Sequence, residues 1–290
     1  MERVLISNSA NFMNTTVTIK IVTKETEQYL AYEVIEKCYN EFRRIVNKYT
    51  RFSETSELSK LNTSQGKFIK VDEEFFYLVK YMLHIANLTN GVFDPTIIDI
   101  LEMYGYDKNY DFTKLDNPLL SNKVKEYLKY RPSYTQIELD EDNKMIKLSK
   151  NQRIELGAIG KGYAIDCCFE IISKYFNDFL IDAGGDIRAN GRNINNEFWK
   201  VGLRSKQGLK YFVELNNQSI SCSGNWARAV KNFHHLIDTS TGRPKETTYS
   251  TVYVMAPTGI ESDTWSTVCF LIGPENISKI IPKNYYYLYL

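Results

Sequence analysis

The residues with the clearest capacity for chemistry lie between Glu155 and Asp166, in the sequence Glu-Leu-Gly-Ala-Ile-Gly-Lys-Gly-Tyr-Ala-Ile-Asp. Three glycines and Lys161 stand at the start of a segment whose spacing predicts an amphipathic helix. A glycine-rich turn lets the N–H groups of a helix N-terminus approach an anion, and a lysine adds positive charge. The glycine spacing matches neither the Walker pattern nor the dinucleotide fingerprint. The stretch is therefore a phosphate-handling arrangement whose spacing alone gives only a weak signal.

Asp263 and Thr267 form a second pair of interest. If the segment is helical, the two side chains lie one turn apart on the same face. A carboxylate and a hydroxyl offer two oxygen ligands to a hard cation such as Mg²⁺, whose shell backbone carbonyls, water and substrate phosphates can complete. As an isolated spacing, the pair is more often a capping or surface pair.

Two of the three histidines, His234 and His235, are adjacent, and Asp238 follows closely. Neighbouring residues of a strand face opposite sides, so one histidine faces the interior if the strand is half-buried. His235 and Asp238 also fall on opposite faces unless the strand ends between them. A histidine has a suitable pKa for proton transfer near neutrality, and a neutral interior histidine with one hydrogen bond is the structural alternative.

Three loops carry further candidate side chains. The polar connector 50–62 carries Phe52, which either anchors the loop or binds a ring. Pro95 holds the residue before it extended, so we predict a fixed loop that displays Phe93 and Asp94 side by side. The segment 221–225 predicts a small polar turn that either contacts a phosphate or only reverses the chain.

Helices and strands in mixed order must position these residues. Hydrophobic spacing predicts helices over 26–49, 72–89, 124–130 and 160–176, with 101–132 as a peripheral excursion. Strands are predicted at 14–22, 136–140, 144–148, 179–182, 198–203, 209–215, 218–222, 233–237, 250–256 and 285–290. No internal repeat or Pro- or Ser-rich linker interrupts the chain. The pattern indicates one intertwined α+β domain over residues 1–290, with mixed or antiparallel sheets flanked by helices.

Composition limits the classes of partner. Thirty-six basic and 35 acidic residues give a formal charge of +1, so no global field recruits nucleic acid or an anionic membrane. Five cysteines without ligand spacing argue against a disulfide framework or a zinc site. The N-terminus lacks the features of a signal peptide or lipobox, and no 18-residue apolar run occurs. We expect a cytoplasmic, non-membrane protein, or an exported one whose N-terminal signal has been removed.

Taken together and in order, these segments resemble the ApbE family, the FAD:protein FMN transferases, from Met13 to about Gly273. Each segment alone is weak, but eight of them in the family's order make the match specific. Thr239 departs from the family pattern by standing where a proline is usual. The matching segments are Met13–Thr16, Phe52–Asn62, Gly91–Thr96, Gly157–Ala164, Asp182–Asp186, Ser223-Gly224, His235–Asp238 with Thr241-Gly242, and Asp263 with Thr267.

The resemblance implies a T-shaped α+β flavin-transferase fold, FAD as a substrate and Mg²⁺ as a cofactor. The implied Mg²⁺ ligands are the backbone carbonyl of Ala158, Asp263 and Thr267. The implied FAD contacts are Met13, Phe52, Val92, Phe93, Asp94, Glu155 and Lys161. Family members split the FAD pyrophosphate, attach FMN to a serine or threonine in a Gly-Ala-Thr/Ser-like segment of a partner flavoprotein, and release AMP.

The residues present suit such a reaction. Phosphoryl transfer requires positioning and charge neutralisation, for which a metal ion, Lys161 and helix amides are appropriate. We predict His235 as the base or orienting group for the acceptor hydroxyl and Asp238 as a secondary candidate. Two other functions stay open: an FAD pyrophosphatase, which would admit water in place of the acceptor, and a non-catalytic flavin-binding or storage protein.

Overall fold

The chain is built around an antiparallel sheet of seven strands. The computed structural model describes residues 2–231 and 233–290. Every neighbouring pair in this sheet is antiparallel, as predicted for the second half of the chain. The strands, in spatial order, are β1 Arg3–Phe12, β2 Thr15–Lys24, β6 Asp178–Ala183, β7 Asp186–Asn190, β10 Gln218–Gly224, β13 Thr251–Ala256 and β14 Tyr286–Tyr289.

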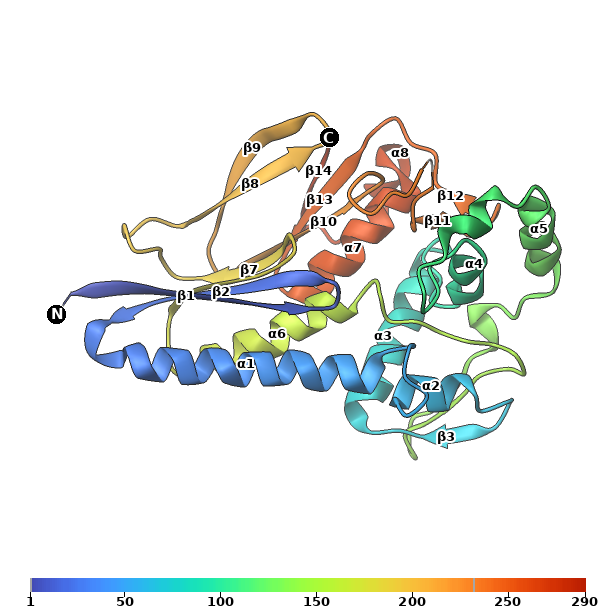
Figure 1. Cartoon of the computed structure of the whole chain (residues 1–290), viewed down its shortest axis with the longest axis horizontal. Coiled ribbons are helices and arrows are strands. Elements are labelled where there is room, and N and C mark those ends of the chain that lie inside the picture. The colour runs from blue at the N-terminus through green and yellow to red at the C-terminus, as the bar shows by residue number, and fades with distance from the viewer. Residues whose placement is uncertain (1, 232) are drawn as a thin grey trace.

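A different layer covers each face of the sheet. Side chains alternate between the faces of a strand: Ile181 of β6 packs under helices, whereas its neighbour Leu180 packs under a hairpin. Helices α1, α6 and α7 form the first layer and strands β8 and β9 the second (Figure 1). Their bounds are α1 Gln28–Tyr49, α6 Gly160–Ile172, α7 Gly259–Ile272, β8 Trp199–Ser205 and β9 Gly208–Leu215.

A partly buried carboxylate fixes α7 against α6. Asp166 of α6 accepts hydrogen bonds from the first two amides of α7, Gly259 N at 2.6 Å and Ile260 N at 2.8 Å. Negative charge at a helix N-terminus is stabilised by the free amides and the helix dipole. Arg188 of β7 donates to the same carboxylate at 2.6 Å. The beginnings of α6 and α7 are therefore held in one defined arrangement.

Further helices and a small three-stranded sheet flank this core. Asp72 caps α3 by accepting from Phe75 N at 2.9 Å, and the helix gives way to Gly91 at φ +79°, as predicted. Connector 50–62 is not wholly a loop, because Ser56 caps a short helix in its second half. The elements here are η1 Glu25–Glu27, α2 Glu57–Asn62, α3 Glu73–Leu88, η3 Tyr134–Gln136, and the sheet β3 Phe68–Lys70, β5 Met145–Lys147 and β4 Glu138–Asp140.

Segment 97–132, which includes the predicted peripheral excursion 101–132, lies at the edge of the molecule (Figure 1), but it has a hydrophobic cluster of its own. Leu101 and Val124 pack there with Phe233 and Ile237, which flank the predicted catalytic histidine in sequence. The elements are α4 Ile98–Met103, η2 Phe112–Asp116 and α5 Leu120–Tyr130. None of the helices in the described part of the chain has the length and apolar character needed to cross a membrane.

Several strand assignments differ from the prediction. Strands β1, β3 and β7 and the two-residue strand Arg243–Pro244 were not predicted. Strand β7 contains Asp186, Arg188 and Asn190, residue types that are uncommon in buried strands. The predicted strand 233–237 is wrong, because only residues 237–238 form a ladder there. The remaining elements are β11 Ile237–Asp238, β12 Arg243–Pro244 and α8 Pro274–Ile277.

Candidate active site

The site is built where the N-terminus of α6 meets the first turns of α7. Gly162 makes this approach possible, because a Cβ at that position would lie 2.2 Å from the backbone oxygen of Gly259 and 2.8 Å from the Cβ of Asp263. The amide of Gly162 donates to Asp263 Oδ2 at 2.9 Å. The carboxylate of Asp263 is thus fixed, and only 5% of the residue is exposed.

The same contact releases the backbone carbonyl of Ala158. In a regular α-helix the amide of Gly162 would donate to the residue four positions earlier, which is Ala158. Asp263 takes that amide instead, and no donor in residues 2–231 or 233–290 makes a hydrogen bond to the Ala158 oxygen. A helix-terminal carbonyl without a partner is a suitable ligand for a hard cation.

Thr267 follows Asp263 by one turn of α7, as predicted. Its hydroxyl lies 3.2 Å from Ser223 Oγ, and Thr267 and Ala158 line one small cavity of about 30 Å³. A carboxylate, a hydroxyl and a free carbonyl are the oxygen donors that Mg²⁺ accepts. The residues present therefore fit the predicted ion in donor type.

Lys161 lies between two carboxylates. Its ammonium forms an ion pair with Asp186 of β7 and lies 3.5 Å from Asp263 Oδ1. The side chain of Asp186 is only 3% exposed. The sequence offered Asp186 only as part of the motif Asp182–Asp186, and the structure shows that its carboxylate holds the predicted phosphate-binding lysine beside the predicted metal ligand.

Segment 221–225 does not form the predicted polar turn. Ser221 and Ser223 belong to β10, and their hydroxyls pair with hydroxyls of α7. Ser221 Oγ lies 2.8 Å from Ser262 Oγ, and Ser223 Oγ lies 2.8 Å from Ser266 Oγ. These bonds tie α7 to the sheet, so the two serines position the helix that carries Asp263 and Thr267.

Six of the predicted site residues line the small cavity, but two of them are buried more deeply than expected. Phe93 and Asp94 are 3% and 7% exposed, so the loop does not display them to solvent. Asp94 accepts from Thr96 N at 2.8 Å and from Arg131 Nη2 at 2.8 Å. Its carboxylate therefore anchors the loop. The six residues are Val92, Phe93, Asp94, Glu155, Ala158 and Thr267.

Glu155 joins that loop to the glycine-rich turn. Its backbone amide donates to Pro95 O at 3.0 Å, and its carboxylate accepts from Gly157 N at 3.1 Å. A Cβ at Gly157 would lie 2.6 Å from this carboxylate. Glycine at 157 thus lets the turn close over Glu155 and brings Ala158 to the cavity.

Met13 and Phe52 lie apart from the small cavity. Met13 and Asn14 form the two-residue turn between β1 and β2 with φ values of 51° and 57°, as a type I′ hairpin requires. Phe52 follows α1, and the Arg51 guanidinium lies 4.7 Å from the centre of its ring. Neither residue lines the small cavity, so a ligand that contacts both of them and that cavity must be extended.

The two histidines have different surroundings. His234 is buried and packs edge-on against Phe270, whereas His235 is partly exposed; the Nδ1 atom of each ring is buried without a hydrogen-bond partner within the described part of the chain. Burial, together with the positive charges of Arg228 and Lys161, lowers the pKa of His235 to about 3. A neutral imidazole at this position can accept a proton.

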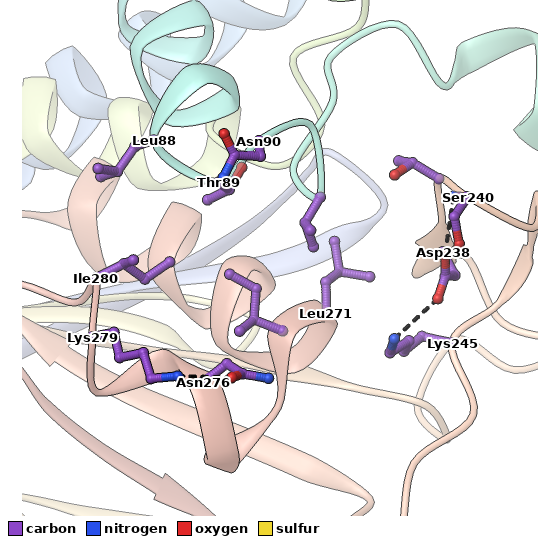
Figure 2. Close-up of a pocket in the computed structure, with 13 residues that line it drawn as sticks. Leu88, Thr89, Asn90, Asp238, Ser240, Lys245, Leu271, Asn276, Lys279 and Ile280 are labelled. Atoms are coloured by element: carbon purple, nitrogen blue, oxygen red, sulfur yellow. Dashed lines mark hydrogen bonds and ion pairs between the residues drawn. The ribbon is translucent and has the colours of Figure 1, made fainter.

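Asp238 is not bonded to His235. Its carboxylate accepts from Lys245 Nζ at 3.0 Å and from Ser240, and it faces a larger cavity of about 490 Å³ (Figure 2). The two cavities share a wall formed by Val92, Thr239 and Leu271.

Thr239 also joins two loops of the site. Its hydroxyl donates to Gly91 O at 2.8 Å, a bond that a proline could not form. The chain at 239 is therefore tied to the loop that carries Val92, Phe93 and Asp94.

Comparison with known proteins identifies this arrangement. The family model described as the ApbE family matches residues 13–288. The chain belongs to the ApbE family. A FAD:protein FMN transferase of Haemophilus influenzae is 25% identical over 100% of this chain and 87% of its own length, and one of Escherichia coli K12 is 25% identical over 80% and 69%. The chain is an enzyme of the transferase class.

Solved ApbE structures confirm the predicted α+β fold. The ApbE protein of Thermotoga maritima superposes with a TM-score of 0.87 at 26% identity, over 98% of this chain and 94% of that one. The flavinyl transferase ApbE of Pseudomonas stutzeri superposes with a TM-score of 0.85 over 100% of this chain and 92% of its own, and at 16% identity it supports the fold alone.

A second cluster in this ApbE chain resembles a metal site but does not fit one. Ligand atoms of Glu41, Glu74 and Cys167 lie within 4.8 Å of one another. Lys48 already donates to Glu74 at 2.6 Å, and burial raises the pKa of Cys167 to about 12, so its thiol stays protonated. A protonated thiol is a poor metal ligand. This cluster serves the packing of α1, α3 and α6.

Proposed function

We propose that this protein is a Mg²⁺-dependent FAD:protein FMN transferase. It splits the pyrophosphate of FAD, attaches FMN through a phosphoester to a serine or threonine of a partner flavoprotein, and releases AMP. The proposal rests on Asp263, which lies against Gly162 N and Lys161, and on Ala158 and Thr267, which line one small cavity, in an ApbE chain whose relatives bear that name. The acceptor segment is of the Gly-Ala-Thr/Ser type.

Ala158, Asp263 and Thr267 are the residues that would hold Mg²⁺. When bound, the ion neutralises charge on the pyrophosphate oxygens. Asp263 supplies the only charged ligand of the three, and its fixed hydrogen bond from Gly162 sets the direction of the carboxylate. Lys161 adds a positive charge next to the ion, and the buried Asp186 keeps its ammonium in place.

The transfer step needs an attacking oxygen and a place for its proton. The acceptor hydroxyl oxygen bonds to the phosphorus on the FMN side, the P–O bond to AMP breaks, and AMP leaves with the bridging oxygen. We assign His235 as the base or orienting group for the hydroxyl, because its ring is uncharged at neutral pH; its lowered pKa makes it a weak base and favours the orienting role. Asp238 is a weaker candidate, since its carboxylate is engaged by Lys245.

FAD must span several parts of the structure in this proposal. Val92, Phe93, Asp94 and Glu155 line the small cavity, whereas Met13 and Phe52 lie beyond it. A cavity of about 30 Å³ holds little more than a water molecule. FAD therefore binds across the mouth of this cavity or widens it by moving side chains.

The test is an assay of FMN and AMP in the presence of FAD, with and without an acceptor flavoprotein, in Mg²⁺ and in EDTA. A transferase releases AMP in an acceptor- and Mg²⁺-dependent manner. Equal AMP formation without acceptor would identify an FAD pyrophosphatase. Bound FAD that stays intact with both acceptor and Mg²⁺ would identify a binding or storage protein. Asp263→Ala should abolish AMP formation, and Asp142→Ala, on an exposed turn, serves as the matched control.

A further inference from the structure

Tyr110 is an aromatic residue that no motif singled out, and a tight turn holds it in an unusual conformation. Its φ of 50° lies in the left-handed region, which a bulky side chain rarely adopts. The turn is well bonded: Tyr110 N donates to Asp107 O at 3.2 Å, and Asp107 Oδ1 accepts from Asn109 N at 2.9 Å. Residues in such conformations persist where the surrounding structure imposes them, and they are frequent at ligand-binding loops.

Tyr110 connects the two predicted flavin contacts that lie outside the small cavity. Asn14, the neighbour of Met13 in the β1–β2 turn, donates from Nδ2 to Tyr110 Oη at 2.9 Å. The ring centres of Tyr110 and Phe52 are 6.2 Å apart. Three segments that are far apart in sequence thus meet at this one side chain.

Tyr110 offers exposed aromatic surface at this junction. One face of Phe52 is covered by the Arg51 guanidinium, 4.7 Å from the ring centre. Tyr110 is 42% exposed, although its hydroxyl and its backbone are both held by hydrogen bonds. An aromatic ring that is fixed in place yet open to solvent is a stacking platform for a planar ligand.

A row of rings leads from this platform to the predicted catalytic histidine. Tyr110 and Tyr106 have ring centres 6.5 Å apart, and Tyr106 and His235 have ring centres 6.1 Å apart. Tyr106 is nearly buried, and its hydroxyl donates to Arg228 O at 2.8 Å. The platform is therefore connected by packed side chains to the site of transfer.

We infer that Tyr110 is a binding residue that stacks on the isoalloxazine ring of FAD, with Phe52 behind it. The inference rests on the proposed function, because it takes the flavin half of FAD as its ligand. It assigns binding of the ring to a residue of segment 101–132, which carries no motif of the family match.

The test is a set of fluorescence titrations with FAD, FMN and AMP in the presence of Mg²⁺, using Tyr110→Ala, Tyr110→Phe and the wild type. We expect Tyr110→Ala to raise the Kd for FAD and FMN about tenfold, in line with stacking on one aromatic ring. The Kd for AMP, which lacks the flavin ring, should not change. Tyr110→Phe keeps the ring and should keep the affinity, but bound flavin should fluoresce more because the quenching phenol is gone.

Tyr130→Ala is the matched control, since Tyr130 is 81% exposed at the end of α5. Wild-type affinity for FAD and FMN in Tyr110→Ala would overturn the assignment. An equal loss of AMP and FMN binding would also overturn it, because that result indicates general damage to the site. If the wild type binds no FAD, the proposed function itself fails, and this outcome is distinguished from the others before any variant is compared. Should Tyr110→Ala not fold, unchanged flavin fluorescence in Tyr110→Phe would overturn the assignment.

Discussion

At the residue scale, the candidate metal site depends on the exchange of one hydrogen bond. The amide of Gly162 donates to Asp263 and not to Ala158 O, its acceptor in a regular helix. This one hydrogen bond orients the Asp263 carboxylate and leaves the Ala158 carbonyl without a helical partner. Thr267 then adds a hydroxyl from the next turn of α7. A neutral side chain of the same shape at 263 would keep the packing but lose the charge that attracts a cation.

Asp263→Asn should therefore retain the fold and lose metal affinity. Loss of residues that only support metal ligands lowers affinity about 10- to 100-fold, so we expect the Mg²⁺ concentration for half-maximal AMP formation to rise by about 100-fold or more. The measurement is activity against Mg²⁺ concentration, with Asp142→Asn as control. An unchanged Mg²⁺ requirement would contradict the assignment of Asp263.

His235 gives a prediction about pH. Its folded-state pKa of about 3 lies below the ordinary value of 6.5, so the ring stays neutral throughout the range from pH 5 to 8. We expect kcat/KM to show no fall with a midpoint near 6.5, and His235→Asn to lower transfer by about 10²- to 10⁴-fold. His234→Asn is the matched control for the turnover effect. An acid limb centred near 6.5 that disappears in His235→Asn would contradict the lowered pKa.

At the scale of elements, the site requires that α6 and α7 cross closely. Gly162 and Gly259 stand at the crossing, and the carboxylate of Asp166 holds the first amides of α7. Hydrogen bonds between serine hydroxyls of β10 and α7 hold the sheet-facing side of α7 against the sheet. The candidate ligands Ala158, Asp263 and Thr267 thus come from elements that two glycines allow to approach closely and that side-chain hydrogen bonds hold in place.

Gly162→Ala should separate the two helices, because the added Cβ would lie 2.2 Å from Gly259 O. Overpacking of this kind costs about 1–3 kcal/mol, and here it also moves Asp263 away from its amide donor. We expect a lower melting temperature together with weaker Mg²⁺ binding.

Gly160→Ala is the control, since nothing lies within 4 Å of a Cβ there. It should be neutral or stabilising, by up to about 1 kcal/mol, because alanine favours a helix more than glycine does. A Gly162→Ala protein with unaltered melting temperature and Mg²⁺ affinity would count against the crossing as the determinant of the site.

Glu74 joins three helices and gives a second prediction at this scale. Its carboxylate accepts from Lys48 and Arg44 of α1 and from Tyr163 of α6, and its side chain is 20% exposed. Burial alone would raise the pKa of Glu74, but the cations of Arg44 and Lys48 outweigh burial and hold it well below 4.5. Because the folded-state pKa is depressed, this stabilisation is present above about pH 4.5 and is lost as the pH falls further.

Glu74→Gln should lower the free energy of unfolding by about 2 kcal/mol at pH 7, since hydrogen bonds to a charged group are lost. The difference from the wild type should shrink as the pH falls below about 4.5. Urea unfolding at a series of pH values measures both effects, with Glu73→Gln on the exposed side of α3 as control. A difference that grows toward low pH would contradict the depressed pKa.

At the scale of the whole molecule, the site gathers residues from both ends of the chain around one sheet. Met13 comes from the β1–β2 turn, Ala158 and Lys161 from the start of α6, and Asp263 and Thr267 from α7. Segment 97–132 packs against the loop that carries His235, through the hydrophobic cluster that it shares with Phe233 and Ile237. FAD would therefore bind where the sheet and helix core meets this segment.

The sequence predicted the elements whose patterns are regular and missed those whose role depends on distant contacts. The spacing of apolar residues identified α1, α3 and α6, and Asp72 and Gly91 marked the ends of α3. Strand β7 escaped prediction because Asp186 and Arg188 are buried there only by virtue of partners on α6. The burial of Asp94 likewise depends on Arg131, which lies 37 residues further along the chain.

The predicted site residues fall into two groups, those that lie together and those that lie elsewhere. Lys161 lies beside Asp263, and Ala158 and Thr267 line one small cavity, whereas Asp238 faces another cavity and pairs with Lys245. No local sequence pattern predicts that Lys161 pairs with Asp186 or that Tyr110 lies beside Phe52. Both contacts form only when segments that are far apart in sequence fold together.

The most direct test of the proposed activity is intact mass spectrometry of a candidate acceptor flavoprotein co-expressed with this protein. We expect a covalent FMN adduct on a serine or threonine of a Gly-Ala-Thr/Ser-like segment, and we expect Asp263→Asn to remove it while His234→Asn preserves it. An acceptor that stays unmodified with the wild-type protein, while FAD is still converted to FMN and AMP, would contradict protein flavinylation as the function.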